Sequence, residues 1–166
     1  MTRRPFGWPA TASTRGRALA DRGPDGGGDA AQHRGRETFI VWDDDHTPAA
    51  TITINRFAKA ELWTEQERAE PALYAHKVTV DRAYGGQGLG AELLDWAGTK
   101  AADEGADWLR VDVWTTNERL QHYYLRQGFT YVRTVVLPHN PSGALFQRPA
   151  QHVPTPRRQD VESLTG

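Results

Sequence analysis

Cysteine is absent from the 166-residue chain and methionine occurs once, so the sequence offers little sulfur chemistry. Without cysteine there is no disulfide framework, no thiolate nucleophile and no cysteine-based zinc site. The formal net charge of −1 gives no reason to expect a nucleic-acid partner. No apolar run approaches the roughly 18 residues of a membrane-spanning helix, which predicts no membrane partner and a cytoplasmic location. The length suits one domain with a single core.

Periodic apolar residues are also nearly missing from residues 1–36, which instead hold seven arginines, seven glycines and three aspartates. Such a composition buries too little surface to offset the entropy of ordering, so we expect this segment to be partly disordered. It contains at most one weak helical stretch, around residues 14–21. The predicted domain therefore comprises residues 37–149, and residues 150–166 are expected to form a loose tail.

Glycines gather directly before the clearest helical pattern of the sequence. A strand-like run, Leu73–Val80, leads through a short polar turn to a cluster formed by Gly85, Gly86, Gly88 and Gly90. Glycines at a helix start leave backbone N–H groups exposed at the positive end of the helix dipole, which favours an anion. We therefore predict a phosphate-binding loop.

Other interpretations of these glycines must be weighed. A P-loop is excluded because no lysine follows the glycines. A dinucleotide-binding fingerprint would match at Gly86, Gly88 and Ala91. However, five residues separate Val80 from Gly86, whereas that fingerprint expects the strand to run almost directly into its first glycine. The remaining alternative is a turn that only shapes the connection from strand to helix.

The hydrophobic periodicity predicts an α/β fold of the α+β type, with a mixed central sheet flanked by helices. The expected elements are a hairpin from residues 39–42 and 50–54, the strand Leu73–Val80, the helix Ala91–Gly105, the strand Trp108–Trp114, a helix from Asn117 to Gln127, and the strand Phe129–Leu137. A capping box at Thr64 and Glu67 predicts a further short helix. Residues 138–149 are expected to be a loop, with at most one last short strand at the sheet edge.

Two motifs resemble those of the GCN5-related N-acetyltransferases. The central pattern of that family, Arg/Gln-x-x-Gly-x-Gly/Ala, is matched at Gly88 and Gly90, with Gly85 in its first position. A second pattern, Asn…Tyr-x-x-x-Gly-Phe, is matched by the segment Asn117–Phe129, about 27 residues further on. The resemblance covers roughly residues 38–137.

The resemblance implies the acyl-CoA N-acyltransferase fold and an enzyme that uses acetyl-CoA as co-substrate, without a metal. The acetyl group would pass directly to a primary amine of a small molecule or peptide within a ternary complex. Tyr124 would protonate the leaving thiolate, and Tyr123 is the competing candidate. The expected cofactor-binding residues are Val78, Thr79, Val80, Gly85, Gly86, Gln87, Gly88, Leu89, Gly90, Ala91, Asn117 and Tyr124. The first three would offer a strand edge to the pantetheine arm.

The base that takes a proton from the acceptor amine is not fixed by either motif. Histidine is a common general base, and His76 lies on the strand before the glycines, so it is a candidate. Asp112 on the following strand and a water chain to bulk solvent are the alternatives. An acidic set could attract a cationic acceptor or only solubilise a surface helix; it comprises Glu61, Glu65, Glu67 and Glu70.

Two wider questions stay open at this stage. A catalytically weak acyl-CoA-binding or partner-binding domain of the same fold is the alternative to an enzyme, and a nicotinamide-dependent enzyme is a more distant one. A homodimer formed through a strand near the C-terminus is also conceivable.

Overall fold

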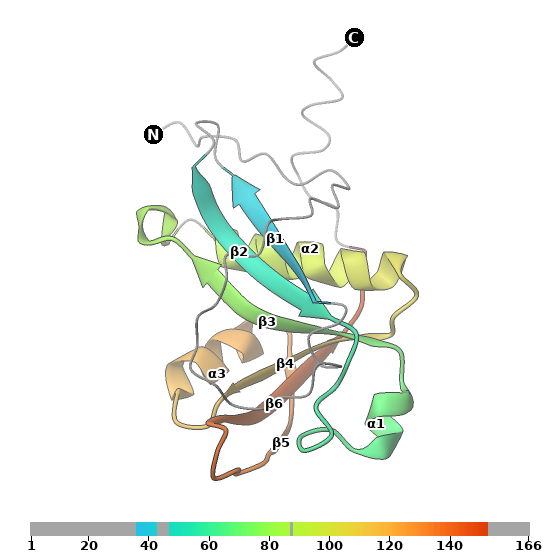
Figure 1. Ribbon diagram of the computed structural model, residues 1–166. Coiled ribbons are helices and arrows are strands. Elements are labelled where there is room, and N and C mark those ends of the chain that lie inside the picture. The colour runs from blue at the N-terminus through green and yellow to red at the C-terminus, as the bar shows by residue number, and fades with distance from the viewer. Residues whose placement is uncertain (1–35, 43–46, 87, 153–166) are drawn as a thin grey trace.

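A computed structural model describes residues 36–42, 47–86 and 88–152, which form a mixed sheet with helices on its faces (Figure 1). The six strands follow the order β1-β2-β3-β4-β6-β5. The elements are β1 (Glu37–Trp42), β2 (Pro48–Asn55), α1 (Glu65–Ala69), β3 (Ala72–Val80), the 3-10 turn η1 (Arg82–Tyr84), α2 (Leu89–Asp103), β4 (Trp108–Trp114), α3 (Glu118–Arg126), β5 (Thr130–Thr134) and β6 (Ser142–Pro149). The helix expected around residues 14–21 and nearly all of the C-terminal tail lie outside the described residues. The predicted fold class is confirmed.

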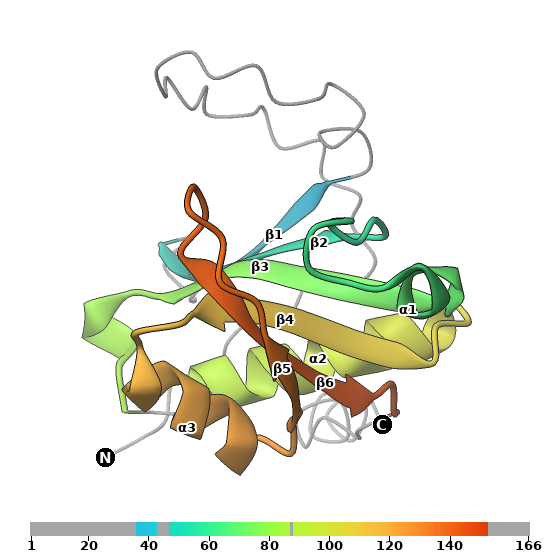
Figure 2. The same cartoon turned by 90° about the horizontal axis from the view of Figure 1, so that it is seen from below.

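One face of the sheet is covered by α2 and α3, which lie on the same side of it (Figure 2). The predicted apolar stripe of α2 is fully buried; its members are Leu89, Leu93, Leu94, Ala97 and Ala101. The helix begins at Leu89, two residues before the predicted start, because Gly88 in the left-handed region serves as its N-cap. Its predicted end is confirmed, since Gly105 follows with φ 77°. This helix is the crossover that makes β3 and β4 parallel.

The prediction that residues 138–149 form a loop, with at most a short strand at the sheet edge, is wrong. Instead of crossing an edge, β6 lies inside the sheet and pairs with both β4 and β5. It occupies this place because its middle residues Ala144, Leu145 and Phe146 are apolar and at most 1% exposed. At Gly143 a Cβ atom would lie 1.8 Å from the carbonyl oxygen of Val135, so only glycine fits there. The free edge near the C-terminus belongs to β5.

The opposite face of the sheet holds a buried arginine. Arg110 is 0% exposed. It donates hydrogen bonds to the main-chain oxygen of Glu67 at 2.7 Å and to the Tyr74 hydroxyl at 3.0 Å. It also pairs with the Glu70 carboxylate at 3.1 Å and lies over the Trp63 ring. A buried guanidinium is tolerated only with such partners, so this network fixes α1 against the sheet.

Glu67 fastens α1 to the far strand β5. The predicted capping box is confirmed, because Glu67 and Thr64 satisfy each other's main-chain amides. The same carboxylate accepts a pair of hydrogen bonds from Arg133. The Arg133 guanidinium is the main reason that the pKa of Glu67 falls from 4.5 to about 2. The charged form is therefore the one that stabilises the fold.

Replacing Glu67 with glutamine is expected to lower the free energy of unfolding at pH 7 by about 1–2 kcal/mol. A folded-state pKa below the unfolded value means that this stabilisation is complete above pH 4.5 and is lost as the pH falls towards 2. Urea unfolding at several pH values should show the gap between wild type and Glu67→Gln narrowing below pH 4.5. Glu65→Gln, on the exposed side of the same helix, serves as the control. A gap that is constant with pH would contradict this assignment.

Candidate active site

The sheet opens between β3 and β4. Their parallel pairing stops at Ala75 and Val111, although both strands continue. Beyond this point β3 remains paired with β2, and β4 remains paired with β6, so the two strands diverge (Figure 1). A register shift against β2 and a φ of 50° at Lys77 mark a bulge where the divergence begins. The β3 edge from Val78 to Val80 consequently has no ladder partner on the β4 side.

The glycine turn lies at the end of this open edge. Gly86 and Gly88 both have φ 75°, a conformation that other residues adopt only with strain. A Cβ atom at either position would meet no protein atom within 4 Å, so the surface there is open. The first internal hydrogen bond of α2 runs from Glu92 to the Gly88 oxygen, which leaves the preceding amides without helical partners. Gln87 lies outside the described residues.

Tyr123 packs against the start of α2. A Cβ atom at Gly90 would lie 2.8 Å from the Tyr123 hydroxyl, so a larger residue there would force the Tyr123 side chain to shift. Burial, followed by the charge of Asp95, raises the pKa of Tyr123. This tyrosine therefore lies beside the glycine turn and the expected phosphate position.

Tyr124 points towards the sheet instead. It is the only buried residue of α3, and its ring contacts those of Phe129 and Phe146. Burial is the main cause of its raised pKa, and the charges of Tyr123 and Asp112 add to it. A phenol with a raised pKa stays protonated, which fits a proton donor and does not fit a base. At the N-terminus of α3 the predicted cap is confirmed, since Asn117 accepts from the Leu120 amide at 3.0 Å.

The two candidate bases, His76 and Asp112, are in contact. Nδ1 of His76 lies 3.4 Å from one oxygen of Asp112, and the ammonium of Lys59 lies 3.2 Å from the other. Burial opposes the charge of Asp112, but the hydrogen bonds and charges of His76 and Lys59 outweigh it and lower the pKa of this carboxyl. Asp112 therefore stays ionised and is placed to accept a hydrogen bond from Nδ1 of His76.

The other ring nitrogen of His76 has no partner. Nε2 is the one buried side-chain nitrogen or oxygen in the described part of the chain that lacks a hydrogen bond. With Nδ1 donating to Asp112, Nε2 carries the lone pair of the neutral ring. A buried lone pair without a donor is costly, which is typical of a position that receives a proton or a ligand.

The opening between β3 and β4 lets the two faces of the sheet meet. Tyr124 belongs to the core cluster on the helix-covered face, together with Val111. Asp112, the next residue of β4, points to the opposite face and pairs with Leu145 of the second cluster. A ligand in the opening would thus have Tyr124 on one side and His76 on the other.

The sequence analysis missed Lys59 altogether. It lies in the segment between β2 and α1, which crosses the sheet face and brings it to Asp112, and no motif marks it. The sequence analysis did identify the acidic set of Glu61, Glu65, Glu67 and Glu70, but these residues do not belong to the β3–β4 opening. Three of its four members have a basic partner of their own: Arg133 for Glu67, Arg110 for Glu70, and His139 for Glu61.

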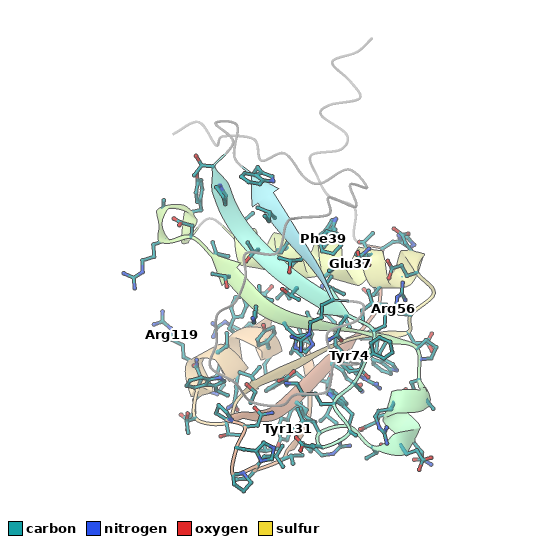
Figure 3. The ribbon with its side chains drawn as sticks, viewed as in Figure 1. Glu37, Phe39, Arg56, Tyr74, Arg119 and Tyr131 are labelled. Carbon is teal, nitrogen blue, oxygen red and sulfur yellow. The ribbon has the colours of Figure 1, made fainter. Side chains whose placement is uncertain are left out.

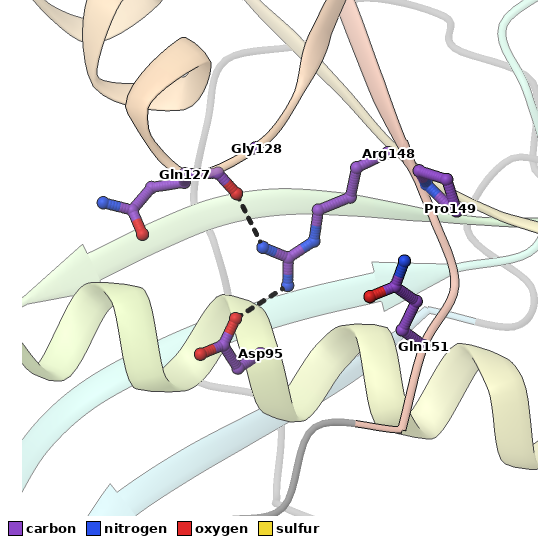
Figure 4. A pocket seen from close by; sticks show the side chains of 6 residues that line it. All are labelled: Asp95, Gln127, Gly128, Arg148, Pro149 and Gln151. Atoms are coloured by element: carbon purple, nitrogen blue, oxygen red, sulfur yellow. Dashed lines mark hydrogen bonds and ion pairs between the residues drawn. The ribbon is translucent and has the colours of Figure 1, made fainter.

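A second hollow, of about 260 Å³, lies between α2 and the end of β6. Arg148 fills its floor and donates to the main-chain oxygens of Gln127 and Leu94 and to the Asp95 carboxylate (Figure 4). Every charge there is paired, and the hollow contains none of the residues around the β3–β4 opening. Its arginine joins α2, α3 and β6, which is a structural role.

Nowhere in 36–42, 47–86 and 88–152 do three or more His, Asp or Glu side chains gather as metal ligands would. In the same ranges no helix is long and apolar enough to cross a membrane.

Comparisons with known proteins identify related sequences and folds. The sequence matches the acetyltransferase (GNAT) family model over residues 6–129. It is 32% identical over 96 residues to the uncharacterized N-acetyltransferase YesJ of Bacillus subtilis (strain 168), which covers 57% of this chain and 53% of that protein. The chain thus spans about half the length of this curated relative.

Solved structures show the same fold at low sequence identity. A GNAT-family acetyltransferase from Listeria monocytogenes 4b F2365 superimposes with a TM-score of 0.59 at 22% identity, covering 68% of this chain and 64% of that one. Nourseothricin acetyltransferase gives a TM-score of 0.55 at 20% identity, with coverages of 71% and 67%.

Proposed function

The chain belongs to the acetyltransferase (GNAT) family, and from this premise we propose that it moves an acetyl group from acetyl-CoA to a primary amine by direct attack in a ternary complex. Members of this family use acetyl-CoA, which supplies the acetyl group as a reactive thioester. The observation that carries the proposal is the opening between β3 and β4, with a glycine turn at one end and His76 at its base.

The chain has residues suited to each part of the co-substrate. The amides around the start of α2, from Gly86 to Ala91, would hold the pyrophosphate, and the positive helix end favours its charge. The unpartnered β3 edge, Val78–Val80, would hydrogen-bond the peptide-like pantetheine arm as an added strand does. Gly85 in the glycine turn and Asn117 at the start of α3 are proposed as further contacts of the co-substrate.

His76 is proposed as the general base. Its Nε2 would accept a proton from the acceptor ammonium, leaving the free amine to attack the carbonyl carbon. Asp112 acts as a positioning residue, because it fixes the Nδ1–H tautomer and stabilises the protonated ring. Lys59 keeps that carboxylate ionised.

Tyr124 is proposed as the acid. Its hydroxyl, kept protonated by burial, would donate to the departing thiolate. The proton accepted at His76 and the proton given by Tyr124 thus travel on opposite faces of the sheet. Tyr123 remains the competing donor, although its contact with Gly90 directs it towards the glycine turn.

Replacing Tyr124 with phenylalanine is expected to lower kcat by about 10²-fold, because only the hydroxyl is removed and the ring still packs. Affinity for acetyl-CoA, measured by calorimetry, should change by less than about threefold. Tyr123→Phe is the matched control and should leave kcat close to that of wild type. The reverse pattern would assign the acid role to Tyr123.

The proposed function itself is tested by thermal unfolding of the full chain with acetyl-CoA or NAD. A ligand at 100 times its Kd stabilises a protein by about 2.7 kcal/mol, which is an easily measured shift. Stabilisation by acetyl-CoA alone, together with thiol release in the presence of an amine, supports the enzyme. Stabilisation without thiol release would favour an acyl-CoA-binding domain, and no stabilisation would overturn both.

A further inference from the structure

A small cationic pocket of about 20 Å³, with room for about one water molecule, adjoins the cluster of His76, Asp112 and Lys59. Its lining, among the described residues, is Arg36, Asn55, Phe57, Ala58 and Lys59. It holds two cationic side chains and no carboxylate. Lys59 belongs both to the pocket and to the cluster. The Asp112 carboxylate therefore links the Lys59 ammonium of the pocket to His76, the proposed base.

Lys59 has donors to spare. Its ammonium carries three protons, and among the described residues only the Asp112 oxygen accepts one. Its side chain is 30% exposed, so it is within reach of a small molecule. An ammonium that is neutralised on one side and open on the other is suited to a second anion.

The other residues of the pocket fit an anionic group with an apolar neighbour. Asn55 is 5% exposed and its Oδ1 accepts from the Phe57 amide at 3.1 Å, which orients its Nδ2 as a donor. Phe57 is 57% exposed and offers an aromatic face beside the two cations. Arg36 is exposed at the start of β1 and adds a guanidinium.

The acidic residues that would suit a purely cationic acceptor are absent from this pocket. Most are paired elsewhere, as described above, and Asp112 is already paired with Lys59 and in contact with His76. A polyamine would meet Lys59 and Arg36 as like charges, and repulsion would oppose its binding.

We propose that the acceptor is an amine that also carries a carboxylate, such as an α-amino acid, with its carboxylate on Lys59 and Arg36 and its amine at Nε2 of His76. This inference rests on the proposed acetyl transfer. The amine loses a proton to His76, its nitrogen bonds to the acetyl carbon, and the C–S bond breaks to release the thiol. The carboxylate is unchanged and serves only to position the amine.

The test compares amino acids with their own α-amides as acceptors. Glycine, leucine, phenylalanine and arginine are each assayed against the corresponding amide, with spermidine as an amine that has no anionic group. We expect kcat/KM for the acid to exceed that for the amide by about tenfold or more. The amide has the less basic amine and more of its free form near neutral pH, so intrinsic reactivity would favour the opposite order.

Variants test which residues are responsible for the preference for acids over amides. In Lys59→Gln the acid-to-amide ratio should fall about tenfold, and in Arg36→Gln by about threefold. Because the ratio compares two acceptors on one variant, any loss of support for Asp112 cancels. Arg56→Gln is the control: this exposed arginine of the same segment turns towards α2 and pairs with Glu104, and its ratio should stay that of wild type (Figure 3).

Each outcome has one meaning. Equal or faster turnover of the amides or of spermidine, or an unchanged ratio in Lys59→Gln, overturns the inference and leaves acetyl transfer intact. Acetyl-CoA binding without turnover of any amino acid overturns it as well. If acetyl-CoA does not stabilise the wild-type protein, the proposed function fails first.

Discussion

Replacing His76 with glutamine is expected to lower kcat by about 10²–10³-fold while acetyl-CoA affinity stays within about twofold. The reason is the buried Nε2, to which no group in the described part of the protein is hydrogen-bonded. Glutamine keeps much of the side-chain size and can still hydrogen-bond to Asp112, but it cannot accept a proton near neutral pH. The loss should therefore appear in kcat and not in binding.

The pH profile separates a base from a merely structural histidine. A wild-type rate limited by a titrating base rises with pH, and this rise should flatten in His76→Gln. His139→Gln is the matched control, because this exposed histidine pairs only with Glu61 on the surface. Asp112→Asn should lower kcat by about tenfold or more through loss of ring orientation. Unchanged kcat in His76→Gln would transfer the role to a water chain.

The second large effect is expected at the glycine turn. Gly88→Ala should raise the Kd for acetyl-CoA by at least about tenfold, because a methyl group would stand where the phosphate approaches the amides. Adding Cβ at φ 75° also strains the backbone by about 1–2 kcal/mol. Binding must be measured below the melting temperature of the variant, so that strain and lost contact are separated.

Gly105 provides the control for this strain. It has φ 77°, and a Cβ atom there likewise meets no protein atom within 4 Å. It follows the opposite end of α2, so Gly105→Ala should lower the melting temperature by a similar amount and leave acetyl-CoA affinity unchanged. If both variants bind acetyl-CoA equally well, the glycine turn serves only the connection between β3 and α2.

Local patterns predicted the elements that depend on local physics. The apolar stripe that includes Leu89 and Leu93 predicted α2, because the buried residues of one helix face recur every three or four positions. Asn117 and Thr64 predicted two helix starts, because an N-cap side chain bonds to main-chain amides that are close to it in sequence. The predicted strand Trp108–Trp114 agrees with β4 at both ends.

Features that depend on distant segments were not predictable in the same way. The place of β6 between β4 and β5 is decided by its pairing with strands that come earlier in the chain, whereas the prolines within residues 138–149 favoured a loop. The contact of Lys59 with Asp112 joins residues 53 positions apart. The sequence could name His76 and Asp112 as alternative bases, but only the fold shows that their side chains are in contact.

The position of β6 also sets when the protein can become functional during its synthesis. Until residue 149 has left the ribosome, β4 can be held in the sheet by only its short parallel pairing with β3. Before then the position of Asp112 is not fixed, and both β4 and β5 lack β6, their main partner in the sheet. The nascent chain therefore carries β4 and β5 without β6, and these strands are prone to aggregation during that time. Folding of the candidate active site is consequently a late event.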